Sequence, residues 1–516
     1  MSQSFSSSQL RLVRIIEAVQ RIMRPEQGVY LVGGGVRDLL LGRPLNDLDL
    51  ACHNAGQFAR KLSEALDGRL VPLGQDHVPP SFRVVFRNVA PKTPDTRPPF
   101  LDVTEIHGKD IGEDLARRDF TVNAMALDLR DLPPQAVGLP TAQDQFPAPW
   151  SRNLIDPCGG LTDVRDGLLR RTGPLAMEQD PLRILRGFRF RAQLGWDIEP
   201  ATLADITAWA PELARMPGER IAVELRLTLE PPGTGRLLAE MERAGVLDVL
   251  FPEIQALRGC TQNHFHHLDV FEHSLAAVQE IDALLGGLAH LFGAGAESVL
   301  HNLQGWRAPW LKLAVLLHDL GKPAAKGRNP ATGRITFYGH DDLGAVMAET
   351  ATLRLRLSGA ERDYIAGLVR HHLHVGVLLR PEGTRKARLR WMRRLGPDLV
   401  PAVLLCLADI RATRGPGSSA QARQDQEIRG IGLILEYLEQ SLTTLAAAPL
   451  VTGHDLLALG MAPGPDLGRL LERLREAQDA REITTREEAL AMAETLSTRD
   501  PACRSESGLG PQAMDS

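Results

Sequence analysis

The hydrophobic pattern of the first quarter of the chain changes between two periods. Apolar residues recur at helical spacing over residues 9–23 and again near 56–67. Around them lie six short apolar runs bounded by Gly, Pro, Asn or Asp, a pattern typical of β-strands. In chain order these runs are VYLVGG, NDLDLAC, RLVPLG, FRVVFRNV, FLDVTEI and NAMALDL. The segment from about residue 28 to 132 is therefore predicted to be a small sheet with one helix among its strands.

Most of the remaining chain has a helical period. A Pro-rich stretch, residues 133–150, separates it from the strand-rich segment. Helices are predicted over residues 180–194, 200–213, 217–229, 234–246, 267–286, 308–320, 341–357, 360–374, 384–396 and 398–412. The fold class is therefore α+β, a small mixed-sheet head on a long helical body. Residues 497–516 are predicted to be a disordered tail.

Composition narrows the class of protein. A chain of 516 residues with 43% apolar and 24% charged residues predicts a globular protein of several domains. Its net charge of −5 gives no overall attraction to polyanions, so such a partner requires a local basic surface. The five cysteines are widely spaced, which argues against a disulfide framework and a zinc ribbon. The sequence shows no signal-peptide pattern and no apolar run long enough to span a membrane, so we expect a cytoplasmic protein without a membrane partner.

The stretch LVGGGVRDLLLGRPLNDLDLAC, residues 31–52, carries the first candidate chemistry. Glycines after a strand let the backbone approach a phosphate, although a simple tight turn explains them equally well. Asp47 and Asp49 alternate along a predicted strand, so both carboxylates lie on one face. Paired carboxylates of this kind hold two divalent cations ~3.5–4 Å apart in phosphoryl transfer, and Asp102 is a candidate third carboxylate. The alternative is a solvated edge strand.

Two further stretches complete a pattern. They are DLARRDFTVNAMAL at residues 114–127 and LIDPCGGLTDVRDGLLR at 154–170. With residues 31–52, the chain resembles the class II tRNA nucleotidyltransferases and their relatives, the bacterial poly(A) polymerases, within the DNA polymerase beta superfamily. Residues 31–52 look like the metal-binding motif, 117–124 the Arg-Arg-Asp-Phe-Thr-x-Asn-Ala motif, 156–163 the Gly-Gly hinge and 180–191 the base-reading helix. The resemblance covers about residues 28–258.

This resemblance implies a DNA polymerase beta-like head followed by a helical neck and body. It implies that Asp47 and Asp49 bind two Mg²⁺ ions and act in catalysis with Asp102. It implies that Gly34, Arg37 and Arg118 hold the nucleotide phosphates and ribose, with Asp119 and Asn123 beside them in the nucleotide site.

The helix that begins at QDPLRILRGFRFR could choose the base. Asp180, Arg183, Arg186 and Arg189 recur every three residues, so they form one stripe along its surface. Cytosine presents two acceptors beside an amino donor, which an Arg and an Asp complement, and adenine fits most of that pattern. Uracil and guanine would leave buried groups unpaired at ~1–3 kcal/mol each. The resemblance implies that Asp180 and Arg183 read the base and that Arg186 and Arg189 point towards phosphate or RNA within the nucleotide site. A solvated Arg-rich face is the alternative.

Local charge supports an RNA partner. Residues 165–195 hold seven arginines and three acids, the electrostatic footprint that a tRNA acceptor stem requires. A second cluster, residues 380–394, has seven basic residues, one acid and Trp391; it either contacts RNA or is an ordinary exposed helix.

Two departures from the family motifs leave the product open. Gln179 stands where the family has Glu before its base-reading Asp. Only VTEIHGKDIGEDLA lies between the third-carboxylate strand and the Arg-Arg-Asp motif. That shortness resembles enzymes that add CC and leave the final A to a partner, so addition of CC, CCA or A alone remains open.

A second metal centre is predicted downstream. Polar residues set inside apolar helical runs are costly to bury without partners, and a divalent ion would satisfy them. The order of these residues along the chain, His, then His-Asp, then Asp, resembles that of the HD phosphohydrolase superfamily. Members of that superfamily with a second metal have further ligands, and this resemblance implies His340 and either His371 or His372 for them. The first set is His273, His318, Asp319 and Asp409. Mg, Mn, Fe, Co and Ni all remain open, and His264, His266 and His267 are taken as hydrogen-bonded core residues.

These features predict six parts of the chain. They are an N-terminal helix (1–27), a nucleotidyltransferase head (28–150), a helical neck and body (151–258), an HD domain (259–415), a helical region of unknown role (416–496) and the tail (497–516). The expected function is untemplated addition of CMP, with or without AMP, from CTP and ATP to the 3′ end of tRNA, joined to a phosphohydrolase. The alternatives are a poly(A) polymerase or A-adding enzyme, a regulatory nucleotidyltransferase that modifies a protein, and an inactive RNA-binding module. The sequence leaves the oligomeric state open.

Overall fold

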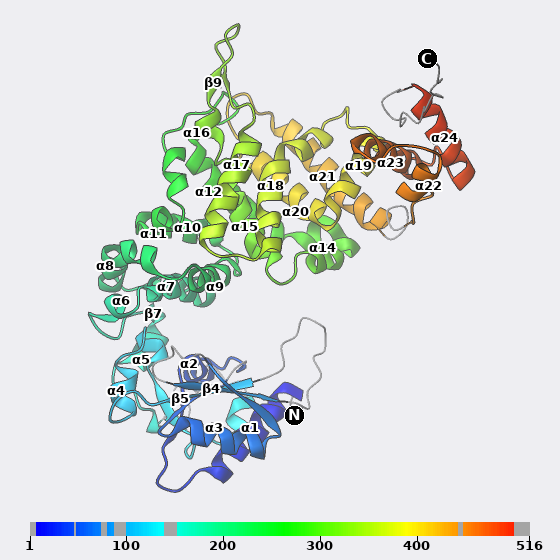
Figure 1. The fold of residues 1–516 in the computed structure, drawn as a ribbon. Helices are drawn as coiled ribbons and strands as arrows, with labels where there is room; N and C mark the ends of the chain where they lie inside the picture. The colour runs from blue at the N-terminus through cyan, green and yellow to red at the C-terminus, as the bar shows by residue number, and fades with distance from the viewer. Residues whose placement is uncertain are drawn as a thin grey trace, which may run out of the picture. The chain divides into compact units, whose positions relative to one another are not determined.

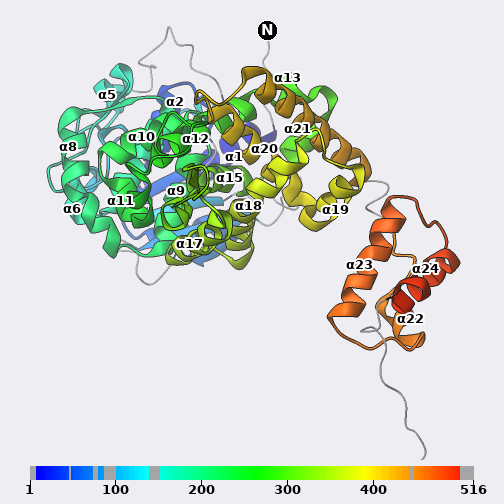
Figure 2. The same ribbon diagram turned by 90° about the horizontal axis from the view of Figure 1, so that it is seen from above.

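The computed structural model describes residues 7–45, 48–73, 80–86, 100–138, 152–441 and 447–499. The chain divides into two compact units, Met1–Pro252 and Glu253–Ser516 (Figures 1 and 2). Each unit is described by itself.

A six-stranded mixed sheet forms the head of the first unit. Its strands are β1 (Val29–Val32), β2 (Leu48–Cys52), β3 (Gly68–Pro72), β4 (Ser81–Phe86), β5 (Phe100–Glu105) and β6 (Ala126–Asp128). They lie in the order β3-β4-β5-β2-β1-β6, and only β2 and β5 pair in parallel. Each strand falls on one of the six predicted runs, so the prediction of the sheet is confirmed. The parallel register sets Asp49 beside Asp102.

Helices flank this sheet. α3 (Ala55–Ala65) packs on β3, β4 and β5, and α1 (Ser7–Ile22) packs against α3 (Figure 1). The prediction of a single helix among the strands is wrong, because α2 (Gly34–Leu40) and α4 (Ile111–Leu115) also form. Helices of seven and five residues span too few turns to show a hydrophobic period. The predicted Pro-rich loop contains a short 3₁₀ helix at Pro134–Gly138, and residues 139–151 lie outside the described residues.

The rest of the first unit is helical. It comprises α5 (Gly160–Asp166), α6 (Ala176–Gln179), α7 (Leu182–Leu194), α8 (Pro200–Trp209), α9 (Gly218–Leu229), α10 (Thr234–Arg243) and α11 (Val246–Leu250), with a parallel pair β7 (Leu168–Leu169) and β8 (Asp197–Ile198). α7 packs along α9. Ile184, Leu185 and Phe188 of α7 are buried, which leaves the arginine stripe of this helix for the pocket described below.

The second unit is built around long helices. These are α12 (Val270–Gly286), α15 (Arg307–Leu317), α17 (His340–Arg354), α18 (Gly359–Leu378), α20 (Leu399–Ala412) and α21 (Ala420–Ser441). Shorter elements are α13 (Leu288–Phe292), α14 (Ala296–Asn302), α16 (Lys322–Ala325), α19 (Arg385–Leu395) and the hairpin β9 (Gly327–Arg328) and β10 (Ile335–Thr336). α12, α15, α18 and α20 pack against one another, and nearly every residue of α20 is buried. Asp269 and Ser358 close capping boxes at the starts of α12 and α18.

A small helical module ends the described chain. α22 (Gly453–Ala458), α23 (Pro465–Asp479) and α24 (Arg486–Arg499) share a core that includes Leu456, Leu474 and Ala493. Since α24 continues to Arg499, the predicted start of the tail at 497 is early, and residues 500–516 lie outside the described residues. The basic cluster at 380–394 contacts this module, because Arg393 forms a two-fold ion pair with Asp479 and Arg390 pairs with Glu476.

One composition test concerns membranes. Within the described residues, no single helix is long and apolar enough to cross a bilayer, and only the pair Val270–Gly286 and Leu288–Asn302, bent by 64°, passes by length and composition.

Candidate functional site

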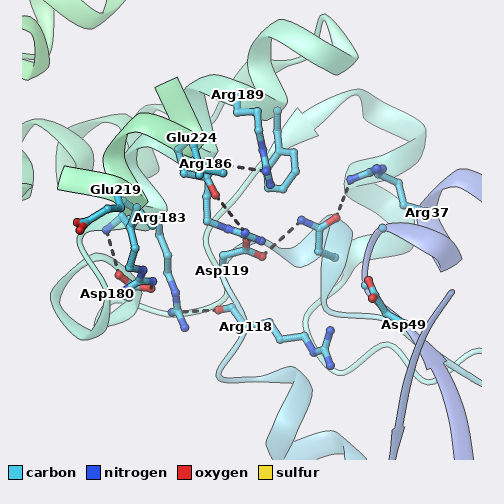
Figure 3. Close-up of a pocket in the computed structure, with 17 residues that line it drawn as sticks. Arg37, Asp49, Arg118, Asp119, Asp180, Arg183, Arg186, Arg189, Glu219 and Glu224 are labelled. Carbon is cyan, nitrogen blue, oxygen red and sulfur yellow. Dashed lines mark hydrogen bonds and ion pairs between the residues drawn. The ribbon is translucent and has the colours of Figure 1, made fainter. Parts of the chain in front are cut away.

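A pocket of about 860 Å³ lies in the first unit, between the glycine turn, the Arg-Arg-Asp segment, α7 and α9. Figure 3 shows Asp180 and Arg183 at one end, Arg37 and Asp49 at the other, and Arg118 and Asp119 between them. Every predicted nucleotide-binding residue lines it: Gly34, Arg37, Arg118, Asp119, Asn123, Asp180, Arg183, Arg186 and Arg189. Asp49 also lines it, Asp102 is not among the lining residues, and Asp47 lies outside the described residues.

The glycine turn brings Asp49 and Arg118 to one point. Gly33 has φ 72°, a left-handed conformation that glycine adopts without strain. A Cβ there would lie 3.5 Å from Arg118 Nη1 and 3.6 Å from Asp49 Oδ2. Arg37, on the last turn of the short helix α2, is buried and donates to Asn123 Oδ1 at 2.7 Å and to Asp38 Oδ1 at 2.9 Å. The turn therefore presents fixed cationic groups beside a carboxylate.

Asp102 lies beside Asp49 in the sheet but is engaged elsewhere. Arg83 donates from Nε to Asp102 Oδ1 and from Nη2 to Asp102 Oδ2, both at 2.8 Å. The guanidinium also lies 3.7 Å from the centre of the Phe100 ring. Sequence reasoning missed Arg83, whose partner becomes visible only when β4 and β5 are paired in register.

An ion pair between the buried Asp119 and the half-buried Arg186 joins the Arg-Arg-Asp segment to α7. Asp119 accepts from the Phe120 N–H at 2.7 Å and from Arg186 Nε at 2.7 Å. Burial alone would raise the pKa of Asp119, but the Arg186 guanidinium and the Phe120 N–H outweigh it and hold the pKa below its usual range. Asp119 therefore fixes Arg186 as an ionised partner.

α9 supplies a wall of the pocket that sequence reasoning missed. Glu219, Arg220, Val223 and Glu224 all line it. Glu224 is 6% exposed and lies 3.3 Å from Arg189 Nη1 and 3.6 Å from Arg186 Nη1. Burial raises the pKa of Glu224 in spite of these two arginines. The sequence does contain a signal that could have identified Glu224, namely an acid inside the apolar run IAVELRL. A buried acid on a helix needs a basic neighbour.

Backbone carbonyls hold the proposed base-reading arginine. Arg183 donates from Nη2 to Arg117 O at 2.7 Å, and from Nη1 to Ala176 O at 3.2 Å and Arg118 O at 3.3 Å. Burial lowers the pKa of Arg183. Asp180 Oδ1 accepts from the Leu182 N–H and Asp180 Oδ2 from Arg220 Nη2, each at 3.1 Å.

Gln179, the departure from the family motif, is exposed and is not among the lining residues of the pocket.

The second unit gathers the predicted histidines and aspartates from five parts of the chain. His273 comes from α12, His318 and Asp319 follow α15, and His340 and His372 come from α17 and α18. Two groups have ligand atoms within 4.8 Å of one another, namely His273, His318 and Asp319, and Asp319, His340 and His372. Asp319 belongs to both groups. Asp409 on α20 adjoins the first, with its Oδ1 2.9 Å from His273 Nε2.

The hydrogen bonds of this cluster orient its imidazoles. The Nδ1 atoms of His318, His340 and His372 contact the carbonyls of Val315, Phe337 and Val369 at 2.8, 2.7 and 2.6 Å. That contact leaves Nε2 facing the cluster as a lone-pair donor, the arrangement of metal-binding imidazoles. Within the described chain, His318 Nε2, His340 Nε2 and Asp319 Oδ2 are buried and make no hydrogen bond, although Lys322 Nζ lies 2.6 Å from Asp319 Oδ2. The residues present therefore fit divalent ions.

The structure separates the two neighbouring histidines. The His372 ring lies 5.3 Å from that of His318 and 5.4 Å from that of His340. His371 instead packs against Trp391, with ring centres 5.4 Å apart, because consecutive helical residues point in different directions. Of the two predicted alternatives, the structure brings only His372 into the cluster.

The prediction that His264, His266 and His267 are hydrogen-bonded core residues is wrong, because His264 and His267 are exposed. His266 is half-buried, its Nδ1 has no hydrogen-bond partner among the described residues, and it lies against the cluster. Its ring is 4.8 Å from that of His273, and burial lowers its pKa to about 3.

Comparison with known proteins gives the family. Family models described as "Poly A polymerase head domain", "Probable RNA and SrmB- binding site of polymerase A" and "HD domain" match residues 29–170, 195–257 and 270–414. An "A-adding tRNA nucleotidyltransferase" of Deinococcus radiodurans is 34% identical over 92% of this chain and 96% of its own length. The chain belongs to the tRNA nucleotidyltransferase family. A "CC-adding tRNA nucleotidyltransferase" of Thermus thermophilus is also 34% identical, over 90% of this chain and 92% of its own.

Solved structures of this family share the fold. A "CCA-adding enzyme with ATP" matches with a TM-score of 0.56 at 21% identity, covering 98% of this chain and 96% of that one. A Thermotoga maritima CCA-adding enzyme complexed with tRNA has a TM-score of 0.53 at 21% identity, covering 95% and 96%. The predicted family, its α+β class and its HD domain are thus confirmed. Relatives of equal identity carry different product names, so similarity alone does not choose the product.

Proposed function

We propose that the pocket transfers CMP, with AMP as the competing candidate, from a nucleoside triphosphate to the 3′ end of a tRNA. One observation carries this proposal: a single pocket has a carboxylate at a glycine turn at one end and an Asp and Arg pair at the other (Figure 3). The first end suits a triphosphate and the second suits the pairing edge of a base. The partners are therefore tRNA and CTP or ATP. Four free thiols among the described residues support a cytoplasmic setting.

The residues divide the reaction between them. The 3′ hydroxyl of the RNA attacks the α-phosphorus, a new P–O bond forms, and the bond to pyrophosphate breaks. Arg37, Arg118 and the backbone of Gly34 bind the charged phosphates. Asp47 and Asp49 are the proposed ligands of Mg²⁺, since carboxylate oxygens suit hard cations. Magnesium held there would neutralise the triphosphate and favour ionisation of the attacking hydroxyl. Asp102 is the proposed third carboxylate of this centre, and Arg83 holds it through both of its oxygens.

Nucleotide incorporation tests this proposal directly. Purified protein is incubated with tRNA lacking its CCA end and each labelled NTP, alone and in pairs, and products are scored by length. We expect short, defined extension with CTP, and Asp49→Asn to reduce incorporation on the order of 10²- to 10³-fold. A long A tract would favour the poly(A) polymerase alternative. Absence of incorporation with every NTP would refute the proposal.

We propose a second activity for the second unit, the hydrolysis of phosphate esters such as 2′,3′-cyclic phosphates or phosphates at damaged RNA ends. The observation that favours it is that Asp319 is shared by two ligand groups, as a pair of neighbouring ions requires. His273, His318, Asp319 and Asp409 would hold one ion, and Asp319, His340 and His372 the other. Divalent ions held there would supply Lewis acidity for the hydrolysis. The metal can be Mg, Mn, Fe, Co or Ni.

Two adjacent histidines give a matched test of this activity. His372→Ala is expected to lower bound metal, measured by elemental analysis after loading with each ion, and to lower hydrolysis of a 2′,3′-cyclic nucleotide. His371→Ala, one residue away and packed on Trp391, is expected to change neither. Equal effects of both variants would refute this assignment.

A further inference from the structure

We propose that residues 320–339, here named the basic arm, bind a single-stranded RNA end and lead it to the histidine cluster of the second unit. This inference rests on the phosphate-ester hydrolysis proposed for that unit. It names the substrate as an ester at the end of an RNA strand rather than one on a free nucleotide. It is carried by the attachment, the charge and the exposure of the basic arm.

Both ends of the basic arm are attached to the cluster. Near its start, Lys322 Nζ lies 2.6 Å from Asp319 Oδ2. Near its end, the Phe337 carbonyl oxygen lies 2.7 Å from Nδ1 of His340. Between these two points, β9 and β10 pair as a hairpin that extends away from the helices of the second unit (Figure 1). A strand of RNA that follows this hairpin to its base therefore arrives at the residues that would hold the ions.

The turn of this hairpin is held by its own hydrogen bonds. Asn329 Oδ1 accepts from the N–H groups of Ala331 and Thr332 at 3.0 and 3.1 Å. The Asn329 N–H donates to Arg334 O at 2.8 Å, and the Gly333 N–H donates to Asn329 O at 2.8 Å. Gly333 has φ 68°, a conformation that suits glycine in a tight turn. The side chains on either side of the turn are therefore presented on an ordered scaffold.

The charge of the basic arm is entirely positive, in a chain whose net charge is −5. Residues 320–339 contain no Asp or Glu, and their basic residues are Lys322, Lys326, Arg328 and Arg334. The last three are exposed, and none of them pairs with a carboxylate among the described residues. Exposed cations of this kind suit a phosphate backbone, because each cation that meets a phosphate releases a condensed counterion.

An exposed aromatic ring lies at the base of the hairpin. Tyr338 is 82% exposed and stands two residues before His340, a proposed metal ligand. Proteins bind single strands by placing cations along the phosphates and aromatic rings under the bases, which stack on them. Tyr338 is therefore the proposed platform for the base that carries the ester.

The basic arm distinguishes an RNA end from a free nucleotide. Hydrolysis of a terminal 2′,3′-cyclic phosphate adds one water, whose oxygen bonds to phosphorus while the bond to one ribose oxygen breaks and that oxygen takes up a proton from the water. This reacting group is the same in both substrates. Only the RNA has further phosphates that can contact Lys326, Arg328 and Arg334, so the RNA is expected to bind more tightly.

Two esters that share their reacting group test the inference, namely 2′,3′-cyclic CMP and a short RNA that ends in the same cyclic nucleotide. With the metal-loaded full chain, we expect KM for the RNA to be at least about 10-fold lower at low salt. This KM is expected to rise by about two log units per log unit of salt, since each of three cations contributes about 0.7. Equal and salt-independent KM values would overturn the inference and leave the proposed hydrolysis intact. Hydrolysis of neither substrate would refute both.

Matched variants test the basic arm itself. Arg328→Ala combined with Arg334→Ala is expected to raise KM for the RNA about 10-fold, to weaken its salt dependence and to leave KM for cyclic CMP unchanged. Arg328→Lys combined with Arg334→Lys keeps both charges and is expected to keep KM for the RNA.

The ring is tested in the same way. Tyr338→Ala is expected to raise KM for the RNA about 10-fold, whereas Tyr338→Phe keeps a ring on which a base can stack and is expected to keep KM. An equal rise of KM for the RNA and for cyclic CMP in the alanine variants would mean that the basic arm only supports the fold of the cluster, which would overturn the inference.

Discussion

The nucleotide pocket and the histidine cluster both contain buried polar side chains, but the protein satisfies them differently. In the pocket, Asp119 holds Arg186, Arg220 holds Asp180, and backbone carbonyls hold Arg183. In the cluster, His318 Nε2 and His340 Nε2 lack a well-formed hydrogen bond within the described residues, and the Asp319 carboxylate lies 3.1 and 3.4 Å from them. A nucleotide arrives and leaves in every cycle, so its pocket must keep its shape unaided. A cluster completed by resident ions can leave its ligand atoms open.

The largest expected effect comes from Asp319, the residue shared by both ligand groups. Asp319→Asn removes the only charge common to the two proposed ions, so we expect loss of most bound metal and at least about a 100-fold loss of phosphate-ester hydrolysis. Nucleotide incorporation is expected to change less than about two-fold, because Asp319 lies in the second unit. Elemental analysis and the two activity assays check this. Full metal content in the variant would contradict the contrast drawn above.

The next effect concerns the stability of the pocket. Asp119→Asn breaks the pair with Arg186 and leaves this half-buried guanidinium with only the more distant carboxylate of Glu224, which we expect to cost about 2 kcal/mol. Because the pKa of Asp119 is lowered in the folded state, its contribution is present above the unfolded value near 4 and is lost as pH falls through the folded value.

The check is amide hydrogen exchange of α7 at several pH values. The native protein is expected to lose protection on acidification below about pH 4 more steeply than the variant does. Parallel pH profiles would contradict the role of Asp119.

A smaller effect on base selection is expected at Arg220, which holds Asp180 in position but is not proposed to contact the base. Arg220→Ala frees the Asp180 carboxylate, so discrimination against UTP is expected to fall about ten-fold, equivalent to about 1.4 kcal/mol. Arg220→Lys retains a donor and is expected to keep most of the discrimination. Misincorporation of UMP relative to CMP is the measurement. A fall in kcat for both nucleotides with an unchanged ratio would assign Arg220 to folding alone.

The sequence predicts those parts of the molecule that repeat or that belong to a motif. Six strands and the long helices up to residue 412 follow from hydrophobic period, whereas α2 and α4 are too short to show one. α21, α23 and α24 lie in a region that was predicted to be helical without bounds for its helices. Motif residues converge in the pocket as expected. Arg83, Arg220 and Glu224 were missed because their roles depend on partners 19, 40 and 35 or more residues away. Sequence spacing also cannot tell whether His371 or His372 faces the metal cluster, because that depends on how α18 is rotated about its axis where it packs against α17.

The smallest effect is expected at Glu224, and it separates two kinds of buried acid within one pocket. The pKa of Asp119 is lowered by its partners, whereas burial raises that of Glu224 despite Arg186 and Arg189. Its charge therefore adds little net stability, and Glu224→Gln, which keeps the shape, is expected to cost less than about 1 kcal/mol and to leave CTP use nearly unchanged. Urea unfolding of the full chain and kcat/KM for CTP are the measurements. A loss as large as that of Asp119→Asn would mean that the charge on Glu224 holds Arg186 and Arg189 in place, and that the pocket depends on two buried anions rather than one.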